Sequence, residues 1–190
     1  MTDVQPLETE RLILRGFSED DADGIMELLA DESVSRFLPF FPPKNKDEAR
    51  AFIRSRFLSG GRNYALFAKG EESLIGYVTL VEREPHDLGY ALARRHWGRG
   101  FMAEACRAVI ASLDKSEFPY LTATHDVNNP ASGAVMKKLG MIYRYSYVEQ
   151  WQPKNFPVVF RMYQLPFAGA CETYMGYWDE HAEHFVEKTV

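Results

Sequence analysis

The chain has 190 residues, of which 46% are hydrophobic and 26% are charged, so it can bury one good core but is short for two domains. Its net charge is −5 and it contains no run of Lys or Arg, which argues against a nucleic acid held by its phosphates. Residues 1–6 lack the pattern of a signal peptide, and no apolar run approaches membrane-spanning length, so we expect a cytoplasmic protein without a membrane partner.

Hydrophobic periodicity and turn residues divide the chain into strands and helices. Alternating apolar residues predict strands, and apolar residues at i, i+3, i+4 and i+7 behind a Ser or Asn cap predict helices. In chain order, the predicted elements are a strand at 11–15, a helix capped by Ser18 with Asp21 at its third position, a loop at 36–43, a helix from Asn45 or Asp47 to Gly60-Gly61, a hairpin of strands 64–68 and 74–81, a strand at 88–92, a helix after Gly100, a strand at 120–124, a helix between Asn129 and Gly140, and paired strands at 141–148 and 156–165.

The order of these elements predicts a mixed sheet. A strand, a helix and a second strand joined by a crossover of this size lie parallel, so residues 88–92 and 120–124 are expected to be parallel neighbours. The other strands are joined by short turns and are expected to be antiparallel, with helices on both faces of the sheet.

Beyond Pro166 the chain becomes strongly aromatic. We therefore expect a domain at residues 1–166 and a tail at 167–190, helical over 171–188. A helix this aromatic needs a surface to cover, either on its own domain or on a second subunit of a homodimer. The aromatic residues at helical spacing are Tyr174, Tyr177, Trp178, His181 and Phe185.

Neither the cysteines nor the histidines predict a metal site. Cys106 and Cys171 form no Cys-x-x-Cys pair, and Cys106 lies on the apolar face of a predicted helix, as a small buried hydrophobe does. His181 and His184 have the spacing of metal ligands, but with their Glu neighbours they are better explained as the solvated acidic face of a helix.

Two glycines stand one residue apart just before a predicted helix. Gly98 and Gly100 are flanked by Arg95 and Arg99, and the apolar stripe of the helix begins at Met102. The first turn of a helix leaves backbone N–H groups unpaired, and glycine lets a ligand's oxygen atoms approach them, so this junction suits a phosphate. The further glycines of a Walker or dinucleotide-binding loop are missing, and an ordinary tight turn is the alternative.

The motif Arg95-His96-Trp97-Gly98-Arg99-Gly100 resembles the acetyl-CoA loop of the GNAT family of N-acetyltransferases. Leu88-Gly89-Tyr90 before it, and Asn129-Pro130-Ala131-Ser132 and Leu139-Gly140 after it, resemble the ribosomal-protein N-acetyltransferase branch. The resemblance covers residues 7 to 165. It implies a single-domain α/β fold, a mixed, mostly antiparallel twisted sheet with helices on both faces and a V-shaped splay between two central parallel strands.

The resemblance also implies acetyl-CoA as a co-substrate, with no metal and no covalent enzyme intermediate. The pyrophosphate would bind the N–H groups of the loop, and the pantetheine arm would pair with residues 90–92 like an extra strand, where N–H groups near Leu92 would polarise the thioester carbonyl. The expected coenzyme contacts are Tyr90, Leu92, Arg95, Trp97, Gly98, Arg99, Gly100, Phe101, Met102, Asn129 and Ser132.

Acetyl transfer also needs a proton donor for the departing thiolate and a base for the amine. From the residues alone, Asn129 is a helix cap and Ser132 a small residue of the first turn. In the branch that the chain resembles, an Asn and a Ser at this spacing contact the pantetheine and the sulfur, which makes Ser132 the candidate acid; the tyrosine that many relatives carry one turn later is Met136 here. The base is open among Glu82, Glu84, His86, Asp87 and His125, with Glu84 and Asp87 as our choices.

The acceptor groove is expected between an aromatic loop and the strand that begins near residue 141. Aromatic walls with acidic residues suit an amine, either a peptide N-terminus or a small molecule such as an aminoglycoside, polyamine or amino acid. The alternatives are that these aromatics only seal the core, and that the fold binds coenzyme A without turnover. The expected acceptor contacts are Phe37, Phe40, Phe41, Tyr145, Tyr147, Glu149 and Trp151.

Overall fold

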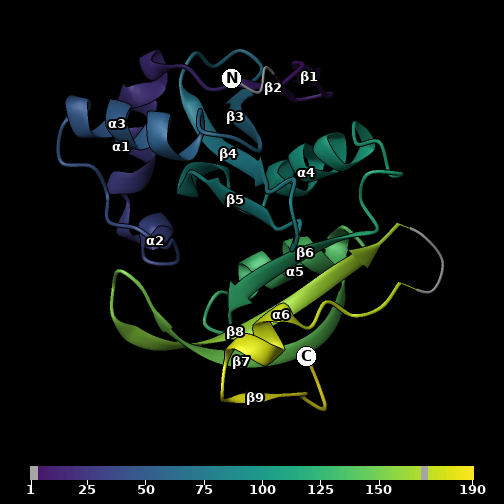
Figure 1. The fold of residues 1–190 in the computed structure, drawn as a ribbon. Coiled ribbons are helices and arrows are strands. Elements are labelled where there is room, and N and C mark those ends of the chain that lie inside the picture. The colour runs from purple at the N-terminus through teal and green to yellow at the C-terminus, as the bar shows by residue number, and fades with distance from the viewer. Residues whose placement is uncertain (1–3, 168–170) are drawn as a thin grey trace.

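The computed structural model describes residues 4–167 and 171–190, which form two antiparallel β-sheets that meet at one edge (Figure 1). The first sheet has the order β1-β2-β3-β4-β5 and the second has the order β6-β8-β7-β9. The strands are β1 (Leu7–Glu8), β2 (Leu12–Gly16), β3 (Arg62–Ala68), β4 (Leu74–Leu80), β5 (Leu88–Leu92), β6 (Tyr120–Asp126), β7 (Ile142–Trp151), β8 (Phe156–Pro166) and β9 (His184–Phe185).

Helices cover both faces of the first sheet, with α1 and α3 on one side and α4 on the other (Figure 1). Because side chains alternate along a strand, the neighbours Ala65 and Leu66 of β3 belong to the two different cores. Ile25 of α1 packs on the first face, and Cys106 and Val109 of α4 pack on the second, as their helical spacing predicts. The helices are α1 (Ala22–Ala30), α2 (Glu32–Ser35), α3 (Lys46–Arg56), α4 (Phe101–Ala111), α5 (Pro130–Lys138) and α6 (Gly176–Glu180), with 3-10 turns at Glu19–Asp21 and Arg94–His96.

Side-chain caps start the helices where the sequence predicts them. Ser18 and Asp21 form a reciprocal capping box, in which the Ser18 backbone N–H donates to the Asp21 carboxylate over 2.9 Å. Asn45 accepts a hydrogen bond from the backbone N–H of Glu48 over 2.9 Å, and Asn129 does the same for Ser132 over 3.3 Å. Each cap satisfies an N–H group that the helix leaves unpaired, which is worth about 1 kcal/mol. These predictions are confirmed.

The splay between β5 and β6 is the feature that positions the site. Among the described residues, the two strands are bridged at the parallel pair Asp87 and Thr122, where the Thr122 backbone N–H donates to the His86 carbonyl over 3.2 Å. Beyond this bridge β5 pairs only with β4, and β6 pairs with β8, so the two sheets diverge. The expected V-shaped splay is therefore present, and most of the length of the predicted parallel pair is open.

Several element boundaries differ from expectation. The helix α3 ends at Arg56 and not at Gly60-Gly61, because those glycines have φ angles of 142° and 76° and belong to the turn that follows. The short elements β1 and α2 were not predicted, since two and four residues are too few for a periodic signal.

The prediction of a helical tail is wrong for most of its length. Only Gly176–Glu180 is helical, and His184–Phe185 forms β9 against the edge of β7. Tyr145 and Tyr147 of β7 offer aromatic surface to the tail, and pairing with an open strand edge satisfies its backbone groups better than a single turn of helix would. The tail thus covers its own domain (Figure 1).

The described residues contain no membrane-spanning helix, no metal-ligand cluster and no disulfide. No helix in residues 4–167 and 171–190 is long and apolar enough to cross a membrane. The same residues contain no group of three or more His, Cys, Asp or Glu side chains arranged to hold a metal ion. Cys106 is buried and Cys171 partly buried, and neither forms a disulfide. Burial raises the pKa of the Cys106 thiol well above its usual range and so favours the protonated thiol over the thiolate.

Candidate active site

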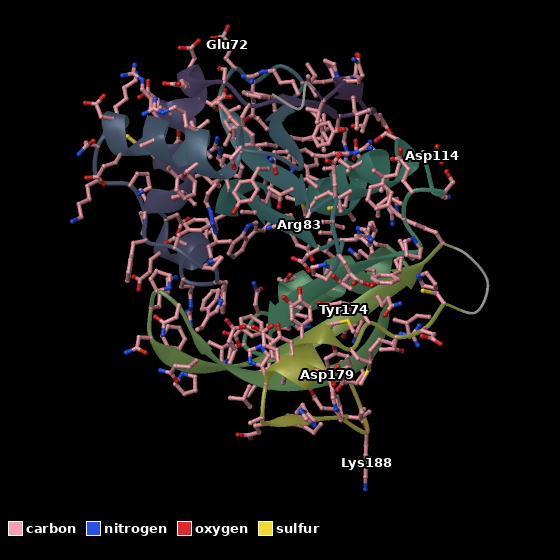
Figure 2. The ribbon with its side chains drawn as sticks, in the orientation of Figure 1. Glu72, Arg83, Asp114, Tyr174, Asp179 and Lys188 are labelled. Carbon is pink, nitrogen blue, oxygen red and sulfur yellow. The ribbon has the colours of Figure 1, made fainter. Side chains whose placement is uncertain are left out.

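A cavity of about 1150 Å³ lies along the splay. It extends from the loop before α4, past β5 and the start of α5, to aromatic side chains of the second sheet and the tail. Arg83 lines it where the two sheets approach each other (Figure 2). Of the predicted coenzyme contacts, the cavity is lined by Tyr90, Leu92, Trp97, Gly98, Gly100, Phe101, Met102, Asn129 and Ser132.

The loop at one end of the cavity has a backbone that only glycine adopts easily. Gly98 has a φ of 73° and Gly100 a φ of 80°, both in the left-handed region, and α4 begins at the next residue, Phe101. The first N–H groups of α4 have no partner within the helix and carry its positive dipole end. The loop and the helix start can therefore cradle an anion, as the spacing of the glycines predicts.

The turn between β1 and β2 binds the carboxylate at the start of α4. Glu104 lies in the first turn of α4, and its carboxylate accepts hydrogen bonds from the Thr9 hydroxyl over 2.6 Å and the Arg11 Nε over 2.7 Å. Burial alone would raise the pKa of Glu104, but these hydrogen bonds outweigh it and the pKa is lowered. Arg11 Nη1 also donates to the Arg99 carbonyl over 3.0 Å and so holds the loop against β2.

The two loop arginines do not line the cavity. Arg95 forms an ion pair with Glu27 of α1 over 3.0 Å. Arg99 hydrogen-bonds the His96 ring over 3.2 Å and lies over the ring of Phe101, 4.5 Å from its centre. The prediction that Arg95 and Arg99 contact the ligand is therefore not met by this structure, and an anion at the loop would be held by backbone N–H groups.

The edge of β5 presents backbone groups to the splay. Just after β5, the Ala93 N–H donates to the Ile75 carbonyl of β4 over 2.7 Å. Successive residues of an antiparallel strand direct their backbone groups to opposite sides of the strand. Tyr90 and Leu92 therefore direct their N–H and C=O groups away from β4, towards the open side. The Trp97 indole donates to the Leu92 carbonyl over 2.7 Å, which ties the loop to this edge.

A tyrosine and a serine face each other across the splay. The Tyr90 hydroxyl donates to the Ser132 carbonyl over 2.9 Å and accepts from the Ser132 hydroxyl over 3.1 Å. Burial raises the pKa of the Tyr90 phenol well above its usual range, so it stays protonated at neutral pH. Met136, one turn after Ser132, is 1% exposed and packs in the core, so this position neither reaches the cavity nor carries a proton.

Asp87 is the carboxylate best placed to act as a base. It lines the cavity beside the bridge between the sheets, and Thr122 donates a hydrogen bond to it over 3.2 Å. Burial raises its pKa to about 6, which a hydrogen bond from Thr122 opposes. Glu84 is exposed, outside the lining, and accepts a hydrogen bond from the Tyr120 hydroxyl over 2.5 Å. The structure thus brings Asp87 and not Glu84 to the cavity.

Two of the remaining base candidates also line the cavity. Glu82 is exposed and forms an ion pair with Arg62 over 3.0 Å. His125 is 4% exposed, its Nδ1 hydrogen-bonds the Asp126 carbonyl over 2.8 Å, and burial lowers its pKa. His86 lies outside the lining. Because Glu82 is engaged by an arginine and His125 by the backbone, neither is as well placed as Asp87 to accept a proton in the cavity.

The far end of the cavity is aromatic and acidic, as expected for an acceptor groove. Phe41 is 62% exposed and lies outside the lining. Tyr145 also lies outside, because its hydroxyl donates to the Tyr174 carbonyl over 2.8 Å and its ring packs on the tail. The predicted acceptor residues that do line the cavity are Phe37, Phe40, Tyr147, Glu149 and Trp151.

The sequence reasoning missed two tyrosines of this end of the cavity. Tyr77 of β4 is one, and its position within a strand gives no signal beyond core packing. Tyr177 of the tail is the other. It was recognised as part of an aromatic stripe, but nothing in the spacing shows that the tail returns to the splay.

Comparison with known proteins decides the family. The sequence model of an acetyltransferase (GNAT) domain matches residues 11–142, which is more than half of the chain. The chain belongs to the GNAT acetyltransferase family. Among curated GNAT relatives, an uncharacterized N-acetyltransferase named p20 from Bacillus licheniformis is 30% identical over 115 residues, which are 56% of this chain and 65% of that protein. The match thus spans just under two thirds of that relative.

Solved GNAT structures have the same fold. The acetyltransferase from Salmonella typhimurium that modifies the N-terminal serine of 50S ribosomal subunit protein L7/L12 superimposes with a TM-score of 0.74, at 17% identity, over 86% of this chain and 100% of that one. The microcin C7 self-immunity acetyltransferase MccE, solved with acetyl-CoA and AMP, superimposes with a TM-score of 0.72, at 14% identity, over 84% and 94%. The predicted GNAT fold is confirmed.

Proposed function

We propose that this protein is an acetyl-CoA-dependent N-acetyltransferase that transfers acetyl directly to a primary amine, in particular the α-amine of a protein N-terminus. The observation that carries the proposal is that one cavity joins an anion cradle at a helix start, an open strand edge and a carboxylate whose pKa is raised to about 6. These are the parts that a thioester donor and an amine acceptor need in one place.

The donor would lie along the splay. Its pyrophosphate would accept hydrogen bonds from the N–H groups after Gly98 and Gly100, and its pantetheine amides would pair with the backbone groups of Tyr90 and Leu92. The Leu92 N–H would then face the thioester carbonyl and stabilise the negative charge that develops on its oxygen. MccE, solved with acetyl-CoA, supports a coenzyme of this kind for the fold.

The chemistry then requires three proton transfers. Asp87 takes a proton from the acceptor ammonium, directly or through water, and the amine nitrogen attacks the thioester carbonyl carbon to form a C–N bond. The C–S bond of the tetrahedral intermediate breaks, and the departing thiolate takes a proton from the Ser132 hydroxyl. The nitrogen still carries one proton more than the amide product, and this proton returns to the Ser132 oxygen through water or through Tyr90, whose hydroxyl shares a hydrogen bond with Ser132.

The acceptor class rests on the aromatic and acidic end of the cavity. Tyr147 and Trp151 form apolar walls of this end, Glu149 supplies a carboxylate that can pair with an ammonium group, and burial raises the pKa of Glu149. The likeness in fold to a ribosomal-protein N-terminal acetyltransferase favours a protein N-terminus and agrees with the ribosomal-protein branch. A small-molecule amine is the second candidate, favoured by the fold shared with MccE.

A thiol-release assay separates the possibilities. The purified protein is incubated with acetyl-CoA and a panel of peptide N-termini, polyamines, aminoglycosides and amino acids, and acetylated products are identified by mass. Release that depends on one peptide class supports the proposal, and release with a small amine alone supports the second candidate. Tight acetyl-CoA binding without release for any amine would instead indicate a coenzyme A-binding module.

A further inference from the structure

The C-terminal segment 171–190 lies outside the family match, yet it is firmly attached to the second sheet (Figure 1). Its attachment is made by the side chain of fully buried Gln164, which donates to the Glu172 carbonyl over 2.8 Å and accepts from the Tyr174 N–H over 2.9 Å. At the other end, Glu187 pairs with Arg161 and accepts from the Ser146 hydroxyl over 2.6 Å.

The stretch between these two anchors lies over the second sheet, from Tyr174 to Asp179 in Figure 2. It carries α6, and the backbone of β9 pairs with β7 just beyond it. A five-residue helix has little stability of its own, so the anchors and the aromatic contacts hold it in place. A side chain from this stretch is therefore presented at a defined position.

That side chain is Tyr177. Its ring stacks on Tyr147, with centroids 5.2 Å apart and planes 13° apart, and it lines the cavity. Its ring also packs on Tyr174, with centroids 5.3 Å apart, and the Tyr174 ring lies 6.1 Å from that of Tyr120, two residues before Thr122 on β6. Asp87 and Thr122 form the bridge between the sheets, so Tyr177 lies at the end of the cavity that Asp87 also lines.

His181 contacts Tyr147, the ring on which Tyr177 stacks. It stacks on Tyr147 with centroids 4.6 Å apart, and its Nε2 lies 4.0 Å from the Glu149 carboxylate. Tyr147 is thus contacted by two residues of the tail. This end of the cavity is bounded by aromatic rings, and among the described residues Tyr177 is the lining ring that the tail supplies.

We infer that the tail completes the acceptor site and that Tyr177 determines specificity, by limiting the acceptor to amines with a compact group on the carbon next to the reacting nitrogen. This inference rests on the proposed function. The nitrogen must approach Asp87, and any substituent on its carbon then meets the Tyr177 ring. Tyr177 does not take part in the proton transfers, so its removal changes which acceptor is used and leaves the donor reaction in place.

The test compares peptides that differ only in their first residue, Ala against Leu or Phe, at saturating acetyl-CoA. In Tyr177→Ala we expect the ratio of kcat/KM for the bulky peptide over that for the Ala peptide to rise by about tenfold or more, because each methylene accommodated is worth about tenfold or more in discrimination. Tyr177→Phe keeps the ring and is expected to keep the wild-type ratio. Val186→Ala, on the same tail with a side chain 63% exposed, is the matched control.

Acetyl-CoA affinity and thermal unfolding are measured for every variant, since the inference requires the donor site to be unchanged. If the loss of the ring loosens the tail, Tyr177→Trp serves instead, and its larger ring should lower the ratio below the wild-type value. The inference is overturned if Tyr177→Ala and Tyr177→Trp both fold, both acetylate the peptides, and both keep the wild-type ratio of kcat/KM values. The proposed function would then still stand. Wild-type protein that acetylates no amine overturns both.

Discussion

Gly98→Ala tests the anion cradle with the smallest possible change. Gly98 is exposed, has a φ of 73°, and a Cβ added to it meets no atom within 4 Å. The added methyl group therefore has no steric effect on the packing, and only the backbone conformation is penalised. A residue other than glycine in this region costs about 1–2 kcal/mol.

The chain offers a control of the same geometry. Gly70, in the turn between β3 and β4, has a φ of 87°, and a Cβ added there also meets no atom within 4 Å, but this glycine does not line the cavity. Gly70→Ala should lower the free energy of unfolding by about the same 1–2 kcal/mol and leave acetyl-CoA affinity unchanged. In Gly98→Ala the exposed loop can relax to escape the strain, and the coenzyme must then restore the cradle, so we expect affinity to fall about 5- to 30-fold.

Calorimetric titration with acetyl-CoA and urea unfolding give the two quantities for both variants. We expect Gly98→Ala to lose acetyl-CoA affinity with little loss of stability, and Gly70→Ala to lose stability with no loss of affinity. If Gly98→Ala binds acetyl-CoA as tightly as Gly70→Ala does, the left-handed loop is not the element that holds the coenzyme, and the proposed donor site would have to be abandoned.

Three other variants test the rest of the site. Asp87→Asn should lower kcat/KM by about 10²- to 10⁴-fold. A pH–rate profile of wild type should show activity falling as pH falls through about 6, and this step should be absent from the Asn variant. The pKa of Asp87 is higher in the folded protein than its ordinary value of 3.8, so wild-type stability should fall as pH rises from 3.8 to about 6. The Asn variant cannot ionise and should therefore be more thermally stable than wild type at about pH 7. Ser132→Ala should lower kcat about 100-fold with little change in acetyl-CoA affinity, and equal losses in both would make Ser132 a binding residue only. Arg11→Ala frees the Glu104 carboxylate at the start of α4 and should weaken acetyl-CoA binding about fivefold, and adding Glu104→Gln should restore it; a double variant as weak as the single one contradicts this role for the ion pair.

Local signals made most of the fold predictable. Ser18, Asn45 and Asn129 start helices because their side chains satisfy N–H groups within three residues, which is information that sequence spacing contains. The tail could not be predicted in the same way. Its aromatic stripe has helical spacing, but an open edge at β7 and the ion pair between Arg161 and Glu187 are tertiary features that override this local preference.

The site residues, too, were predictable only where the signal is local. Gly98 and Gly100 were predictable because the backbone conformation they allow is a local property. Arg95 was expected to face the coenzyme, but the structure turns it to Glu27, a partner 68 positions earlier that no local pattern identifies. Tyr177 was missed for the same reason, since its place in the cavity depends on how the whole tail is attached.

The family match covers the residues proposed to bind the donor, but it ends before most of β7, β8 and the tail. The match ends at residue 142, where β7 begins, and the loop, β5, β6 and α5 all come before it, so every proposed donor contact lies inside. Glu149, Trp151 and Tyr177, which bound the acceptor end of the cavity, all come after it. Phe37, Phe40 and Tyr77 also line this end of the cavity and lie inside the match, so the match covers the proposed donor site completely and the proposed acceptor site only in part. Because Tyr177 comes from the part that the match does not cover, variants at Tyr177, and not at the glycine loop, should change what the enzyme acetylates.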